Sequence, residues 1–318
     1  MNKRRSFLRQ AGLLSAGVFL TPAIISCSSN TENAAEDTTT ADANTDAATT
    51  ETASDAVIGL QLYSLREQIK AEGIEAVIPK VSAAGYKEVE TYGYSKENGF
   101  WGLDANAFSE LLKANNLTCP SGHYGLDPYL AGGNEDLLQS YIDAAKIIGT
   151  TYITIPYLGD NLRKDAASYK KLAQRINEAA KKVNEDGLKL AYHNHDFEFK
   201  QLGDTTGYEI LLKETDPELV KMELDLYWAY RADKDPVAMM QEHPGRFVMW
   251  HVKDMDKTDK ALNTEVGSGS IDYKTLFSKV QAEAEHIFVE QENFAAGMDP
   301  YKSISQSHDY IVNNLLNS

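Results

Sequence analysis

Cysteine is scarce in this sequence, and long apolar runs are almost absent. Only Cys27 and Cys119 occur among the 318 residues, and Cys27 ends an N-terminal segment with the features of an export signal. With Cys27 assigned to that signal, no intrachain disulfide can form, so the fold must depend on its packed core. Beyond the signal, no apolar run approaches the ~20 residues that a membrane-spanning helix needs.

Positive charge is also scarce. The chain carries 31 Lys and Arg residues against 47 Asp and Glu residues, a formal net charge of −16. Residues 1–27 contribute four positive charges and residues 28–55 seven negative ones, which leaves −13 on residues 56–318. That balance opposes binding to nucleic acid or to anionic lipid. We therefore expect no nucleic-acid partner.

The N-terminus predicts export and lipidation. Arg4-Arg5-Ser6-Phe7-Leu8 resembles a twin-arginine motif, and a short apolar run follows it. Ile24-Ile25-Ser26-Cys27 resembles a lipobox, in which the cysteine is lipidated and becomes the mature N-terminus. We expect a signal peptide over residues 1–27 and a periplasmic or membrane-anchored lipoprotein, with membrane contact only through Cys27. The alternative is a plain secretory signal with an incidental cysteine.

Residues 28–55 contain no lysine, arginine or aromatic residue, but seven acids. Such a segment cannot bury enough apolar surface to offset its ordering entropy, so we predict a disordered acidic tether rich in Thr and Ala. Residues 56–318 then form the folded part. Their length is typical of a single α/β barrel.

Short runs of β-branched and aromatic residues alternate with helical patterns through the folded part. The predicted strands cover residues 57–64, 86–93, 117–125, 151–159, 189–199, 220–229, 247–255 and 286–294. Eight strands that alternate with helices predict a (β/α)8 TIM barrel. The alternative, a doubly wound open sheet, would require a glycine-rich phosphate loop after the first strand, and LQLYSLREQ has none.

Ionisable residues gather at the predicted strand ends, where the active site of such a barrel lies. Strand alternation places four pairs on common faces: His193 with His195, Glu223 with Asp225, His251 with Lys253, and Glu290 with Glu292. Buried charges of this kind are costly unless they meet counter-ions. The mixed nitrogen and oxygen donors suit Mn²⁺, Zn²⁺, Co²⁺ or Fe²⁺. For any single residue, a hydrogen-bonded structural role is the alternative.

Several stretches resemble one family. IGLQLYSLRE, GYKEVE, YHNHDFEF, ELDLYWA, WHVKD and GSGSIDYKTLF are similar to stretches of the xylose isomerase-like TIM barrels, in particular the sugar phosphate isomerase/epimerase group. The resemblance extends from about residue 57 to residue 315. It implies a divalent cation held by an acid, an Asp, a His and a Glu on strands five to eight.

The resemblance implies that Asp225, His251 and Glu290 bind this cation. At strand five, many relatives have Glu-Asn-His where this chain has His193-Asn194-His195, which places His193 at the ligand position. His195 and Glu198 stay open as alternatives for that ligand. An imidazole in place of a carboxylate removes one negative charge, which favours Mn²⁺, Co²⁺ or Zn²⁺ over Mg²⁺.

The resemblance also implies a reaction. In epimerases of the family, the cation polarises a substrate carbonyl and two groups exchange the proton of the neighbouring C–H bond. The catalytic candidates are Glu290 as the base, with His195, Lys253 and His123. The residues expected to bind the substrate are Gln61, Tyr63, Glu90 and Trp228.

We therefore predict a divalent-metal-dependent isomerase or epimerase that acts on a sugar or keto-sugar outside the cytoplasm. One alternative is a lyase or hydrolase of 3-keto-glycosides with the same metal site, which the imidazole at strand five favours because one face of the substrate then carries the chemistry. A second alternative is a carbohydrate-binding lipoprotein without catalysis. The expected partner is a small carbohydrate, and by analogy with many relatives a second copy of the chain.

Overall fold

Eight parallel strands close into a barrel. The computed structural model describes residues 57–280 and 284–316, so the predicted signal peptide, Cys27 and the tether lie outside the described residues. The strand order around the barrel is β1-β12-β9-β8-β5-β4-β3-β2. The strands are β1 Gly59–Gln61, β2 Glu88–Tyr92, β3 Thr118–His123, β4 Tyr152–Ile155, β5 Lys189–His193, β8 Val220–Asp225, β9 Phe247–Val252 and β12 His286–Val289. The predicted TIM barrel is confirmed.

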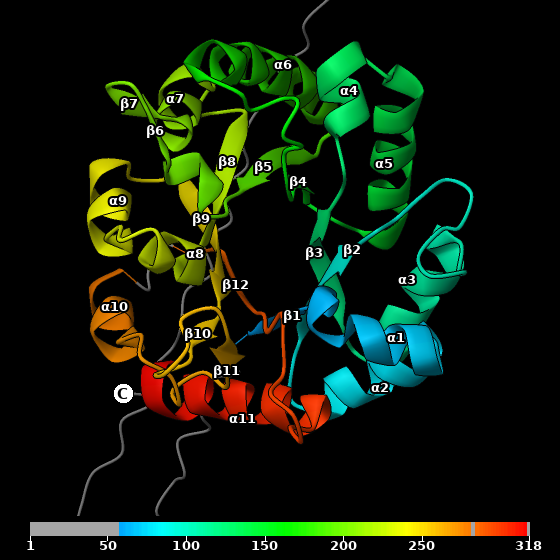
Figure 1. The fold of residues 1–318 in the computed structure, drawn as a ribbon. Coiled ribbons are helices and arrows are strands. Elements are labelled where there is room, and N and C mark those ends of the chain that lie inside the picture. Colours follow the sequence, from blue (N-terminus) through cyan, green and yellow to red (C-terminus); the bar gives the residue numbers. More distant parts are fainter. Residues whose placement is uncertain (1–56, 281–283, 317–318) are drawn as a thin grey trace, which may run out of the picture. The chain divides into compact units, whose positions relative to one another are not determined.

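Helices surround the barrel on its outside (Figure 1). They are α1 Arg66–Glu72, α2 Ile74–Ala83, α3 Ala105–Ala114, α4 Asp127–Gly132, α5 Glu135–Ile148, α6 Ala166–Glu185, α7 Gly207–Glu214, α8 Leu226–Arg231, α9 Pro236–Glu242, α10 Tyr273–Val280 and α11 Pro300–Ile311. Two small antiparallel pairs, β6 Gln201–Leu202 with β7 Thr205–Thr206 and β10 Asp254–Met255 with β11 Asn263–Thr264, lie in the loops. No helix of the described residues is long and apolar enough to cross a membrane.

Helix α6 illustrates how the outer layer packs. Its buried residues Tyr169, Leu172, Ala173 and Ile176 recur at intervals of three and four, so one face of the helix covers the barrel. Asp165 precedes the helix, and its carboxylate accepts a hydrogen bond from Ser168 N at 2.8 Å. This element is one of the helices expected to alternate with the predicted strands.

All eight barrel strands end earlier than the sequence predicted, and local chemistry explains three of these ends. Pro156 has no N–H to continue the ladder after β4. After β5, Glu198 Oε2 accepts a hydrogen bond from His195 N at 2.9 Å, which turns the chain. Asp225 ends β8 by capping α8, where its Oδ1 accepts from Trp228 N at 2.8 Å. Local hydrogen bonds therefore place several of the ionisable residues at strand ends rather than within strands.

The barrel interior has an apolar layer and a polar layer. Tyr152, Ala191, Met249 and Phe288 belong to a buried apolar cluster separate from the main core, and strand alternation places them on one face. Two residues further along the same strands, the same face carries Thr154, His193, His251 and Glu290. The apolar layer therefore closes the barrel below the polar one, and the polar groups lie toward the C-terminal ends of the strands.

Asp254 fixes the loop that covers the end of β9. Its carboxylate accepts hydrogen bonds from the backbone N–H groups of Met255 (2.8 Å), Gly267 (2.9 Å), Gly269 (3.0 Å) and Ile271 (3.2 Å). A Cβ atom at Gly269 would overlap Asp254 Oδ1, so this approach requires glycine. The motifs WHVKD and GSGSID, which are separate in sequence, are thus parts of one structure.

Replacing Asp254 should destabilise the fold. Asp254→Ala removes an acceptor shared by four backbone N–H groups in a buried position, which we expect to lower the free energy of unfolding by about 2–4 kcal/mol. Urea denaturation followed by circular dichroism measures this change. Asp256 accepts hydrogen bonds only within its own exposed turn, from Thr258 and Asp259, so Asp256→Ala is a control with an expected loss below about 1 kcal/mol. Equal losses in the two variants would contradict the role given to Asp254.

Candidate metal centre

A cavity of about 410 Å³ opens where the barrel strands end. The ionisable residues that line it are His123, His193, His195, Glu290 and Glu292. Tyrosine side chains also line it, and two of them, Tyr63 and Tyr157, are 39% and 45% exposed. The cavity is therefore polar at depth and aromatic at its rim. It lies at the end of the barrel that carries the active site in TIM-barrel enzymes.

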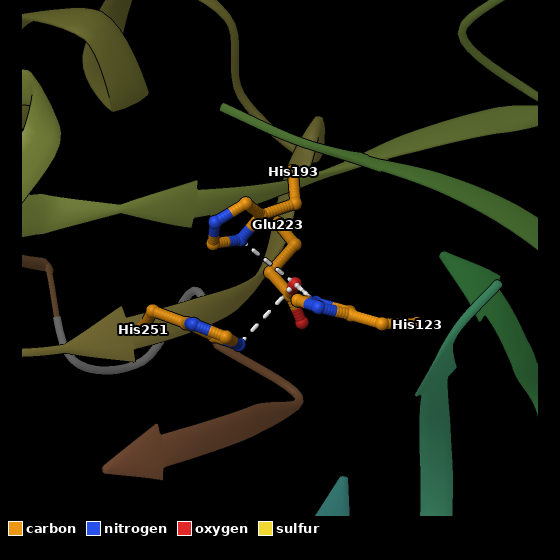
Figure 2. Close-up of side chains that lie close together, drawn as sticks. All are labelled: His123, His193, Glu223 and His251. Carbon is orange, nitrogen blue, oxygen red and sulfur yellow. Dashed lines mark hydrogen bonds and ion pairs between the residues drawn. The ribbon is translucent and has the colours of Figure 1, made fainter. Parts of the chain in front are cut away.

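Glu223 of β8 lies between three histidines (Figure 2). Its Oε2 atom is 2.8 Å from His123 Nε2, 3.0 Å from His193 Nδ1 and 3.3 Å from His251 Nε2. The histidines come from β3, β5 and β9, and the Glu223 side chain is fully buried. These four residues offer ligand atoms that all lie within 4.8 Å of one another, so they are one group that could hold a metal ion.

A second group of possible ligands shares His251. Asp225, His251 and Glu290 also place ligand atoms within 4.8 Å of one another. His251 Nδ1 is 2.9 Å from Glu290 Oε2 and 4.0 Å from Asp225 Oδ2. His193 Nε2 is 3.7 Å from the same Asp225 oxygen. The structure thus brings together the four residues predicted to bind metal.

Lys253 lies among three carboxylates. Its Nζ atom is 2.6 Å from Asp225 Oδ2, 2.6 Å from Glu290 Oε2 and 2.5 Å from Glu292 Oε1. Burial alone would lower the pKa of Lys253, but the three carboxylates outweigh it and raise this pKa well above its ordinary value. Burial raises the pKa of Asp225 to about 6, with Lys253 acting in the opposite direction. Lys253 is therefore a fixed positive charge beside the predicted ligands.

The pKa values of the histidines in the site are shifted in different directions. Burial alone would lower the pKa of His251, but Glu223 and Glu90 raise it well above the ordinary value. Burial, together with the charge on His251, holds the pKa of His193 well below its ordinary value. Burial and then Lys253 lower the pKa of His195 to about 3. His193 and His195 are therefore neutral at physiological pH. His251 would lose a proton on binding a metal ion, because a neutral imidazole is the form that binds.

Two residues predicted to bind substrate are buried outside the cavity lining. Glu90 Oε2 is 2.6 Å from His251 Nε2 and 3.2 Å from His123 Nε2. Gln61 Nε2 donates to the same oxygen at 2.6 Å, and the Ser121 hydroxyl donates to the other oxygen. Gln61 and Glu90 are fully buried. In the structure Glu90 contacts the rings of His123 and His251, and Gln61 holds Glu90 in place.

The other predicted residues lie at the cavity. Tyr63 and His195 line it, and Trp228 Nε1 donates to Glu292 Oε1 at 3.1 Å. The His195 ring stacks on Phe197, with 5.5 Å between ring centroids, and its Nδ1 atom is buried without a hydrogen-bond partner. An imidazole held in this way leaves a nitrogen for a ligand.

Glu198 is directed away from the metal centre. Its Oε1 accepts a hydrogen bond from Tyr192 OH at 2.6 Å, and Oε2 accepts from His195 N. Tyr192 lies on the opposite face of β5 from His193, because side chains alternate along a strand. Of the three strand-five alternatives, only His193 belongs to one of these two groups of described residues, and its Nε2 atom is 3.7 Å from Asp225 of the other group.

Sequence reasoning gave no role to several residues of the site. Strand alternation placed Glu223 and Glu292 on the inward face, but it could not show that Glu223 contacts three histidines or that Glu292 contacts Lys253. Tyr92 and Tyr157 line the cavity, and Tyr157 follows a strand that ends earlier than predicted. These roles depend on contacts between strands that only the closed barrel creates.

The closed barrel and the polar cluster at its C-terminal end define a TIM-barrel protein with an enzyme-like site. The chain belongs to the xylose isomerase-like TIM barrel family, whose sequence profile matches residues 78–312. This confirms the family resemblance drawn from the sequence motifs.

Comparison with known proteins adds enzyme relatives. An inosose dehydratase of Clostridium beijerinckii is 22% identical over an alignment of 281 residues, and the match covers 76% of this chain and 90% of that protein. An inosose dehydratase of Lactiplantibacillus plantarum is 28% identical over 148 residues, so the match spans 41% of this chain and about half (49%) of the relative.

Among solved structures, a sugar phosphate isomerase/epimerase of Parabacteroides distasonis superposes with a TM-score of 0.74 at 24% identity. The superposition covers 86% of this chain and 99% of that one. At this level of identity the likeness shows a shared fold.

The burial of Glu198 predicts a pH-dependent stability. Burial raises the pKa of Glu198 to about 7 from an ordinary value of 4.5, so the folded state holds this proton more tightly than the unfolded state. The free energy of unfolding should therefore fall as the pH rises from about 4.5 to about 7, by up to about 3 kcal/mol, and then level off.

Glu198→Gln should remove this component, because glutamine keeps the acceptor for His195 N without the charge. Denaturant unfolding at pH values from 4.5 to 8 measures it. The matched control is Glu185→Gln, at an exposed position on α6. A pH dependence in Glu198→Gln identical to that of the wild type would refute the assignment.

Proposed function

We propose that the protein is a divalent-metal-dependent isomerase or epimerase of a sugar or keto-sugar, acting outside the cytoplasm. The observation that carries this proposal is the convergence of Asp225, His251 and Glu290 within 4.8 Å at the edge of a 410 Å³ cavity. The family relationship supports an enzyme, and the isomerase/epimerase and dehydratase names of the similar proteins support chemistry next to a carbonyl group.

The residues present fit a divalent cation. His193 and His251 offer imidazole nitrogens, and Asp225 and Glu290 offer carboxylate oxygens, a set that suits Mn²⁺, Co²⁺ or Zn²⁺. Asp225 Oδ2 is buried and makes no hydrogen bond of good geometry, although Lys253 Nζ is 2.6 Å away. A cation held by these residues would supply Lewis-acid polarisation of a substrate carbonyl.

The chain's own residues supply the proton transfers. Glu290 lines the cavity and contacts His251 and Lys253 through Oε2, so we assign its Oε1 as the atom that accepts a proton from the carbon next to the carbonyl. His123 also lines the cavity. Burial alone would lower its pKa, but Glu90 and Glu223 raise it, so His123 is the proposed proton donor. Lys253 offers a positive charge to a developing oxyanion.

An unphosphorylated substrate suits this cavity. Among the described residues that line it, there is no arginine or lysine. A phosphate group would meet Glu290 and Glu292 without a matching cation at the wall. The proposed export also favours an unphosphorylated sugar, because sugar phosphates are mostly intracellular.

A lyase acting on 3-keto-glycosides is the second candidate, and the cavity favours it in one respect. Its volume lies in the range of about 300–1,000 Å³ that is typical of sites for drug-sized ligands. Exposed Tyr63 and Tyr157 at the rim offer faces on which an aglycone can stack. Elimination needs a base on only one face of the substrate. This requirement suits a site that has an imidazole, in place of a second carboxylate, at strand five.

Reactions in deuterated water with added Mn²⁺, Co²⁺ or Zn²⁺ separate the two candidates. A panel of keto-sugars and 3-keto-glycosides is followed by NMR and mass spectrometry. Deuterium at the carbon next to the carbonyl with the glycosidic bond intact supports the isomerase or epimerase, whereas release of the aglycone supports the lyase. Binding of sugars without turnover under all metal conditions would overturn both and support a carbohydrate-binding protein.

Asp225→Asn tests the metal centre directly. Asparagine keeps the cap on α8 but removes the negative charge, so metal content should fall and kcat/KM should drop by at least about a hundredfold. Asp235→Asn makes the same change at the cap of α9, and activity should stay at the wild-type level. Full activity of Asp225→Asn would refute a metal enzyme at this site.

Cys27→Ser tests the proposed location. If Cys27 carries a lipid, the wild-type protein sediments with membranes and the variant is released in soluble form after export. Fractionation of cells that express each form, with immunoblotting, measures the distribution. Membrane association that is unchanged in Cys27→Ser would contradict lipid anchoring.

A further inference from the structure

The histidines of the metal centre present different ring nitrogens to two sets of carboxylates. His193 directs Nε2 toward Asp225 and Nδ1 toward Glu223. His251 directs Nδ1 toward Glu290, at 2.9 Å, and Nε2 toward Glu223 and Glu90. Each imidazole therefore joins the proposed metal ligands Asp225 and Glu290 on one side to buried carboxylates on the other.

Glu223 is the carboxylate common to these contacts. The same Oε2 atom receives His123, His193 and His251, and the side chain is fully buried and outside the cavity lining (Figure 2). A neutral imidazole has one N–H group and one lone pair. A hydrogen bond from Nδ1–H of His193 to Glu223 therefore leaves the Nε2 lone pair directed at Asp225, where a cation can use it.

We propose that Glu223 is a positioning residue that fixes the tautomer of His193 for the metal ion. This inference rests on the proposed metal centre and adds a residue to it. Glu223 holds His193 as the Nδ1–H tautomer. Glu90, whose Oε2 atom is 2.6 Å from Nε2, holds His251 as the Nε2–H tautomer, so the free lone pairs of both rings face Asp225 and Glu290. In metalloproteins such outer carboxylates orient the ring and increase the basicity of the ligating nitrogen.

The same distances allow a rival arrangement, in which Glu223 is itself a ligand together with His123, His193 and His251. The contacts of Asp225 and Glu290 favour the positioning role. If the cation lay among the three histidines, the His193 Nε2 and His251 Nδ1 atoms would carry the protons, and the His193 proton would face Asp225 Oδ2 across 3.7 Å, too far for a hydrogen bond. In the positioning arrangement the N–H group of His193 has Glu223 Oε2 at 3.0 Å and that of His251 has Glu90 Oε2 at 2.6 Å.

Cobalt binding tests this role apart from activity. The metal-free protein is titrated with Co²⁺ against a chelator of known affinity, and the visible spectrum of bound Co²⁺ reports its ligands. Glu223→Gln should lower Co²⁺ affinity about 10–100-fold, and the absorption bands should keep their positions because the ligands are unchanged. Glu223→Asp keeps the charge and should recover part of the affinity.

Glu88→Gln is the matched control. Glu88 is a nearly buried glutamate of the same barrel, 7% exposed, and it pairs with His286 at 2.9 Å, away from the metal centre. The Glu88→Gln variant should bind Co²⁺ with the affinity of the wild type. Equal loss in Glu88→Gln and Glu223→Gln would indicate general damage to the barrel and would overturn the specific role of Glu223.

NMR of the zinc-loaded protein with ¹⁵N-labelled histidine reads the tautomers directly. In the wild type we expect Nδ1–H for His193 and Nε2–H for His251, and a mixture at His193 in Glu223→Gln. Unchanged affinity and tautomers in Glu223→Gln would overturn the proposal. So would loss of the cobalt bands in Glu223→Gln while Asp225→Asn retains them, because Glu223 would then be a ligand.

The outcomes also separate this inference from the proposed function. A wild-type protein that binds no Co²⁺ or Zn²⁺ would overturn the positioning role and the metal centre together. A protein that binds metal with the expected tautomers, but turns over no keto-sugar or 3-keto-glycoside, would support the positioning role while the proposed reaction fails.

Discussion

The structure of the site depends on charge compensation inside a closed barrel. Four buried carboxylates, those of Glu90, Glu223, Asp225 and Glu290, surround a small volume, and the partly exposed Glu292 lies at its edge. An unpaired charge there would cost several kcal/mol. Lys253 and the imidazoles supply the compensation, and they do so through contacts of 2.5–3.3 Å from several strands. Strand order and register must therefore bring these groups to one level, and the apolar layer beneath closes the barrel under them.

The sequence predicted the fold and the location of the site because both follow from local patterns. Alternation assigned His193, Asp225, His251 and Glu290 to the inward face, and their strand-end positions assigned them to one end of the barrel. The sequence did not predict the pairing within the site. Which nitrogen of His251 faces Glu90, and which faces Glu290, depends on side-chain directions set by packing across strands.

The end of strand five shows most clearly what the sequence pattern could not predict. Alternation predicted that His195 would follow His193 on the inward face, and Glu198 stayed open as an alternative ligand. The strand ends at His193 because Glu198 accepts a hydrogen bond from His195 N, while Asn194 Oδ1 accepts one from Asp225 N at 3.0 Å. Periodicity cannot indicate such a turn, since it depends on a side chain three residues further on and on the neighbouring strand.

A chain of contacts joins the rim of the cavity to its floor. Trp228 Nε1 donates to Glu292, Glu292 contacts Lys253, and Lys253 contacts both Asp225 and Glu290. A substrate hydroxyl that bonds to Glu292 would compete with Lys253 for that carboxylate, so Lys253 would shift its contacts toward Asp225 and Glu290. Binding at the rim would then change the negative charge available to a cation at the floor. If the site holds the proposed cation, the recognition of a substrate at Glu292 would therefore be linked to metal affinity through Lys253.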